Sequence, residues 1–113
     1  METIRLNVNS YVLDENSDTL DSQSCIITAD YQIYGGIRRK SFPSVNSFVV
    51  INFDGITTAN YVRVTSDQTI TILIDGTKEQ TGKSWIIQAN VASLSIKNQS
   101  GVTANIEYEI AGS

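Results

Sequence analysis

Apolar residues recur at every second position along much of the chain. This spacing predicts β-strands, because successive side chains of a strand point to opposite faces of a sheet. A run without polar interruption, residues 48–51, predicts a central strand that is buried on both faces. Shorter apolar runs begin at Trp85 and Leu94. The regular alternation covers residues 4–8, 27–33, 62–64, 70–74 and 102–110.

Glycine and short polar residues separate these segments and predict turns. They tolerate the positive φ angles that tight turns between strands require. Residues 66–68 form a short polar link between two predicted strands. Two longer polar segments, residues 14–24 and residues 38–46, predict loops. The turn signals are Gly35 and Gly36, Asp54 and Gly55, Asp75 and Gly76, and Ser100 and Gly101.

The fold class follows from this pattern and from the residue types that carry it. Isoleucine, valine and threonine are abundant, and β-branched residues favour strands over helices. A length of 113 residues predicts one domain over residues 1–113. About eight closely spaced strands predict an all-β fold, a single antiparallel β-sandwich of jelly-roll-like type. Seven strands would fit an immunoglobulin-like sandwich instead.

The sequence lacks the residues that catalytic, metal-binding and disulfide sites usually require. The sequence has no histidine, which removes the commonest general base and metal ligand. One cysteine, Cys25, permits neither an internal disulfide nor a paired-cysteine metal site. The net charge of −4 argues against a nucleic-acid partner. We therefore expect no catalytic, metal or cofactor residues and no enzyme activity. We also expect no membrane span and no secretory signal peptide.

Two motifs resemble ligand-binding loops and then depart from them. Residues 76–84 resemble a phosphate loop, but five residues separate the glycines where that motif has four, and a strand follows instead of a helix. We interpret this segment as a hairpin loop. Asp14, Asn16 and Asp18 match the first ligands of a calcium loop, whose later positions fail at Thr19 and Cys25. We interpret it as an acidic loop, with a looser calcium site as the alternative.

Other residue types have a plain structural interpretation beside a functional one. Glu107 and Glu109 share one face of the last strand, as a hydrolytic pair would, but alternating glutamates also protect a solvent-facing strand from aggregation. Trp85 next to two isoleucines predicts a core residue, and Cys25 a small buried one. Three tyrosines together with Trp85 could instead form a platform for stacking sugars, and these are Tyr31, Tyr34 and Tyr61.

The basic residues gather at one place in the chain. Arg38, Arg39 and Lys40 are consecutive, and Tyr34 lies just before them. Cationic side chains in a loop, with an aromatic residue beside them, suit contact with an acidic surface of a protein partner; the alternatives are contact with a phosphate backbone and a plain solvated loop. We therefore predict a partner contact at Tyr34, Arg38, Arg39 and Lys40.

The later part of the chain resembles a known kind of protein. Residues 60–76, NYVRVTSDQTITILIDG, form a strand–turn–strand pattern, and residues 82–112 follow with LSIKN and a closing IAG. Over about residues 48–112 this order resembles small virion structural proteins of tailed bacteriophages. The resemblance implies a non-enzymatic capsid decoration, neck or tail accessory subunit. It would assemble in the host cytoplasm, into the virion, through symmetric contacts with itself and other virion proteins. The alternative is a carbohydrate-binding sandwich module.

Overall fold

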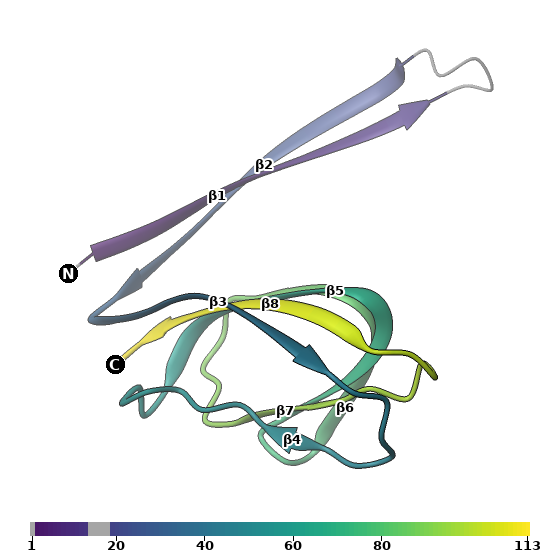
Figure 1. Ribbon diagram of the computed structural model, residues 1–113. Coiled ribbons are helices and arrows are strands. Elements are labelled where there is room, and N and C mark those ends of the chain that lie inside the picture. The colour runs from purple at the N-terminus through teal and green to yellow at the C-terminus, as the bar shows by residue number, and fades with distance from the viewer. Residues whose placement is uncertain (1, 14–18) are drawn as a thin grey trace.

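Every regular element in the described part of the chain is a β-strand (Figure 1). The computed structural model describes residues 2–13 and 19–113, with side chains for residues 3–6 and 31–113. All strand pairings are antiparallel, so the predicted all-β antiparallel fold is confirmed. The strands are β1 (Glu2–Leu13), β2 (Thr19–Tyr31), β3 (Ile33–Phe42), β4 (Val49–Val50), β5 (Ala59–Ile74), β6 (Lys78–Ile87), β7 (Leu94–Lys97) and β8 (Ala104–Gly112).

Six of these strands form one curled sheet around the long strand β5. The order is β3-β8-β5-β7-β4, and β6 pairs with the other edge of β5. The first half of β5 pairs with β8 and its second half with β7. Between Thr65 and Ile70 the register with β6 shifts, which is an irregularity of the kind that bends a strand. The bend turns the two halves of the sheet toward each other (Figure 1).

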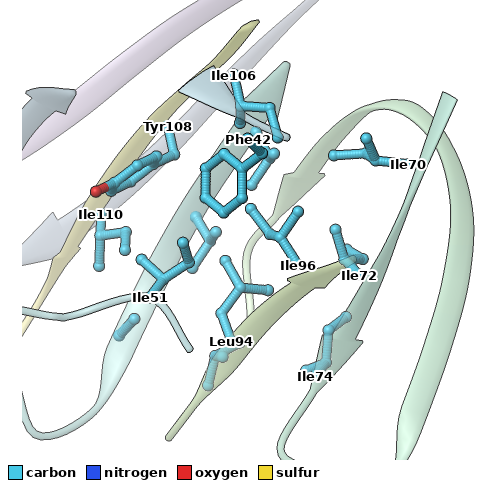
Figure 2. Close-up of a cluster of buried hydrophobic side chains, with 14 of the residues drawn as sticks. Phe42, Ile51, Ile70, Ile72, Ile74, Leu94, Ile96, Ile106, Tyr108 and Ile110 are labelled. Atoms are coloured by element: carbon cyan, nitrogen blue, oxygen red, sulfur yellow. The ribbon is translucent and has the colours of Figure 1, made fainter. Parts of the chain in front are cut away.

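The hydrophobic core fills the space between the two halves of this sheet. Alternate residues of β5, β7 and β8 point into it, and Phe42 at the end of β3 lies among them (Figure 2). Each fully buried isoleucine or valine contributes about 1.5–3 kcal/mol relative to an exposed side chain. The least exposed members are Ala59, Val62, Val64, Ile70, Ile72, Val91, Leu94, Ile96, Ala104 and Ile106.

Strands β1 and β2 form a separate hairpin that extends away from the sheet (Figure 1). Its register runs continuously from Glu2 opposite Tyr31 to Val12 opposite Asp21. The hairpin joins β3 through Gln32, whose N–H donates to the Gly112 carbonyl oxygen at 2.9 Å. It is therefore tied to the sheet at its root, beside the last residues of β8.

Two sequence predictions about strands were wrong. Residues 38–42, predicted as part of a loop, belong to β3 and pair with β8. Residues 38–41 are polar because β3 is an edge strand, and charged residues are common on such edges, whereas Phe42 enters the core. Residues 48–51, predicted as a central strand, contain only the two-residue strand β4, which pairs with β7. Its Val50 is 71% exposed, while Ile51 closes the edge of the core.

Some of the predicted turns are confirmed and others are wrong. Asp54, Gly55, Asp75 and Gly76 have φ angles of 48°, 88°, 53° and 69°, as tight turns require, so both turns are confirmed, and the second joins β5 and β6 as a hairpin. The turn predicted at residues 35–36 is wrong, because these glycines form an irregularity within β3. Residues 66–68 lie inside β5 and do not separate two strands.

The remaining predicted loops are shorter than expected, because part of each belongs to a strand. Residues 19–24, predicted as loop, belong to β2, and residues 14–18 lie outside the described residues. Residues 76–84, which resemble a phosphate loop, are a turn followed by strand β6, which begins at Lys78, so their interpretation as a hairpin is confirmed. The threonines and serines of residues 19–24 and 76–84 are compatible with strand edges as well as with loops.

Candidate functional site

The outer face of the sheet, opposite the core, carries a row of charged residues. Because alternate residues of β8 enter the core, Glu107 and Glu109 point outward. The register places Glu109 between Ile37 of β3 and Arg63 of β5. It places Glu107 opposite Arg39 in the same way. The pairing of three strands thus brings two glutamates and two arginines together.

Glu109 is the centre of this network and is 9% exposed. The Tyr34 hydroxyl donates to its Oε2 at 2.5 Å, and the Tyr61 hydroxyl donates to its Oε1 at 3.2 Å. Arg63 Nε donates to the same Oε1 at 3.3 Å. A buried carboxylate is tolerated only with such partners, because removing it from water without them is costly.

Glu107 extends the network toward the edge of the sheet. Arg63 Nη2 donates to its Oε1 at 3.0 Å, and Arg39 Nε donates to its Oε2 at 3.0 Å. These hydrogen bonds lower the pKa of Glu107, Arg63 making the larger contribution. The Arg39 side chain is 81% exposed, whereas that of Arg63 is 18% exposed. The network therefore runs from a solvent-facing cation to a buried carboxylate.

The two tyrosines of the network are held in their protonated form. Burial, followed by the hydrogen bond to Glu109, raises the pKa of Tyr34 from 10.0 to about 12. Burial and the charge of Glu109 raise the pKa of Tyr61 as well. Both hydroxyls therefore remain hydrogen-bond donors at neutral pH. A carboxylate of β8 that accepts hydrogen bonds from hydroxyls of β3 and β5 helps to hold these three strands in position.

An open hollow lies beside this network at the end of the outer face. Its volume is about 560 Å³, and although most of its lining residues are polar, apolar atoms make up more of its wall than polar atoms do. Asp67 accepts from the Asn105 backbone N–H at 2.8 Å and from its side-chain amide at 3.0 Å, which fixes one wall. The hollow could receive polar side chains of a partner. It is lined by Arg39, Lys40, Ser41, Thr65, Ser66, Asp67, Asn105, Ile106 and Glu107.

The predicted partner contact does not form one cluster. Tyr34 and Arg39 lie on the outer face, bound to Glu109 and Glu107. Arg38 forms an ion pair with Asp54 and donates to the Gly35 carbonyl oxygen at 3.3 Å. The Lys40 ammonium lies 5.3 Å from the centre of the Phe42 ring. These residues belong to a strand rather than a loop. Successive side chains of a strand point to opposite faces, so the four residues are divided between the two faces of the sheet.

Sequence reasoning found part of this site. The prediction that Glu107 and Glu109 share a face is confirmed, but the expectation that both face solvent is wrong for Glu109. The partners Tyr61 and Arg63 were not identified, although they alternate in step with the core residues of β5. Only the register between strands distant in sequence reveals that they meet Glu109.

The sequence also singled out Trp85, Tyr31, a candidate calcium loop and Cys25. Trp85, predicted as a core residue, is half-buried and packs against the core without being enclosed in it. Tyr31 and Tyr34 form a tilted ring pair, with centroids 5.6 Å apart. The candidate calcium loop, from Asp14, and the Cys25 side chain lie outside the described residues.

Two observations concern the chain as a whole. Among the residues that the structure describes, no helix has the length and hydropathy needed to cross a membrane. Comparison of the sequence and structure with protein-family models, curated proteins and solved structures finds no match.

Proposed function

We propose that this chain is a non-enzymatic structural subunit of a tailed-phage particle, a capsid decoration, neck or tail accessory protein. It would act through contacts with copies of itself and with other virion proteins, and would assemble in the host cytoplasm. The observation that carries the proposal is the long hairpin β1–β2, which extends away from the sheet (Figure 1).

A free hairpin of this length needs packing partners. Strand β1 has 12 residues, which at about 3.3 Å per residue span roughly 40 Å. An isolated two-stranded hairpin is at best marginally stable in water and is stabilised by further strands or by a packed face. Of its described side chains, Ile4 and Tyr31 pack against the sheet, on Tyr61 and Ala111. A neighbouring molecule is the natural source of the missing contacts.

The finer prediction of the fold belongs to this proposal. A curled sheet with its core between two halves is compatible with a sandwich. The eight-stranded, jelly-roll-like form stays a prediction, since β1 and β2 pair with each other and not with the other strands.

The mass of the purified full-length chain, measured by light scattering over a concentration series, tests the proposal. We expect a defined oligomer, such as a ring or a trimer, whose fraction rises with concentration. A strict monomer at every concentration would contradict contacts between copies. Symmetric particles seen by negative-stain electron microscopy would support the structural role further.

Replacing Arg38, Arg39 and Lys40 together with alanine tests the predicted partner contact. We expect weaker assembly without unfolding, because surface ion pairs such as Arg39–Glu107 contribute only about 0–1 kcal/mol to stability. Replacing Lys78 and Lys83 of β6 with alanine is the control, since it also removes exposed cations. Assembly that is unchanged in the first variant would exclude this contact.

A carbohydrate-binding module remains the second candidate, and the ring pair Tyr31–Tyr34 favours it. Tyr34 is 43% exposed beside Tyr31 and could stack against a sugar. A glycan screen with Tyr34→Ala as the comparison tests this candidate. Binding that the substitution abolishes would support it, and the absence of any binding would exclude it.

A further inference from the structure

The charge of the chain is divided unevenly between its hairpin and its sheet. Residues 1–31, which include β1 and β2, hold six acidic residues and one basic residue, a net charge of −5. Residues 32–113 hold seven basic and six acidic residues, a net charge of +1. Opposite net charges on two parts of one chain allow each part to attract the other part of a second copy.

The acidic residues of the hairpin gather in one stretch of the sequence. We call residues 14–21 the acidic segment, since no basic residue lies among them. β1 ends at Leu13 and β2 begins at Thr19, so the acidic segment includes the connection between the strand ends that lie farthest from the sheet (Figure 1). Its acidic residues are Asp14, Glu15, Asp18 and Asp21.

The hollow beside the outer-face network has cationic groups that its own carboxylates do not occupy. Arg39 donates to Glu107 through Nε, so both of its Nη groups remain available. Within the described residues Lys40 forms no ion pair, and its ammonium lies over the Phe42 ring. By contrast, both oxygens of Glu107 and both oxygens of Asp67 already accept hydrogen bonds.

The cationic groups lie at one side of the hollow. Arg39 and Lys40 line it from β3, Asp67 lines it from β5, and β8 lies between these strands. Two strand spacings, about 10 Å, thus separate the backbone of Asp67 from β3, and salt screens much of its charge over that distance. Arg38 is already paired with Asp54. Arg39 and Lys40 are therefore the groups that suit incoming carboxylates.

The incoming carboxylates come from another molecule. The far end of the hairpin is directed away from the sheet of its own chain (Figure 1), and β1 alone spans roughly 40 Å. We propose that the acidic segment of one copy binds the hollow of a second copy through Arg39 and Lys40. The inference rests on the proposed structural function, to which it adds the two surfaces that meet. One copy contributes its hairpin and the next its sheet, and contacts of this kind close into rings or extend as filaments.

An exchange of charges between the two surfaces tests this contact on the full-length chain. The hollow variant carries Arg39→Glu and Lys40→Glu, and the segment variant carries Asp14→Lys, Glu15→Lys and Asp18→Lys. Each variant alone has like charges on both surfaces, so we expect the Kd of assembly to rise on the order of 10–100-fold. A mixture of the two variants again offers opposite charges at every contact, so it should assemble like the wild type.

Two controls accompany these variants. Lys78→Glu with Lys83→Glu makes the same charge change on β6, outside the hollow, and should assemble like the wild type. Trp85 fluorescence verifies that the sheet is folded in each variant. If the hollow variant does not fold, Arg39→Gln with Lys40→Gln removes the cations without adding negative charge and should still weaken assembly.

Light scattering of each variant and of the mixture decides the inference. An oligomer that is lost in each variant alone and restored in the mixture supports it. An oligomer that persists in both variants overturns it and leaves the structural function standing. Loss in both variants without restoration in the mixture also overturns it, because a general effect of charge has that result. A wild-type chain that is monomeric at all concentrations overturns both proposals.

Discussion

Replacing Glu109 with glutamine changes the charge of the outer-face network while preserving the shape of its central side chain. Glu109 accepts hydrogen bonds from Tyr34, Tyr61 and Arg63 in a position that is 9% exposed. Hydrogen bonds to charged groups contribute about 1.5–3 kcal/mol, against about 1 kcal/mol for neutral ones. Tyr34 and the pair Tyr61 and Arg63 donate to different oxygens of Glu109. Glutamine keeps only one acceptor oxygen, so its NH2 group faces one of these two sets of donors, while Arg63 keeps Glu107. We therefore expect the free energy of unfolding to fall by about 2–3 kcal/mol.

Urea unfolding followed by Trp85 fluorescence measures this loss, since Trp85 packs against the core. Glu79→Gln is the matched control, because the same chemical change at an exposed residue of β6 should alter stability by less than about 0.5 kcal/mol. For a domain of this size, the loss at Glu109 corresponds to a fall in Tm of roughly 10–20 °C. Equal effects of the two substitutions would refute the structural importance of the buried carboxylate.

A double-mutant cycle refines the same test. Tyr34→Phe removes one donor to Glu109. We expect it and Glu109→Gln to be non-additive by about 0.5–3 kcal/mol, as is typical of residues in direct contact. Strict additivity would mean that this hydrogen bond does not contribute to stability.

Three further predictions follow from the same structure. The folded state raises the pKa of Tyr34 from 10.0 to about 12, so its protonated hydroxyl contributes fully to stability below pH 10 and this contribution is lost as the pH approaches 12. The Tm measured across this range should therefore fall more steeply for wild type than for Tyr34→Phe. Gly112→Ala should lower stability by about 1–3 kcal/mol in urea unfolding, because the added Cβ would meet the Thr58 carbonyl oxygen; unchanged stability would contradict this packing. Ile72→Ala should cost about 2–5 kcal/mol by the same assay, and Val50→Ala, at a 71% exposed position, less than about 0.5 kcal/mol; similar losses would refute the placement of the core.

The core was predictable wherever alternation was strong. In β8, the apolar residues at positions 104, 106, 108 and 110 all enter the core, as the pattern indicates. The pattern failed where burial depends on distant strands. Residues 48–51 look like a buried strand, yet their place at the edge beside β7 leaves Val50 in solvent.

The candidate site was less predictable than the core. Arg38, Arg39 and Lys40 form a cluster in the sequence, but a strand sends neighbours to opposite faces. Glu109 and its partner Arg63 are 46 residues apart in the chain. The local spacing of residues predicts which face of a strand each side chain occupies. It does not predict the register between distant strands, which brings Glu109 and Arg63 together.

The central claim is that copies of this chain assemble through contacts between them. The most direct test is the absolute mass of the full-length protein, measured by light scattering as its concentration is raised. Our account predicts a shift from monomer to a defined oligomer. A mass that stays at the monomer value over the whole range would contradict it.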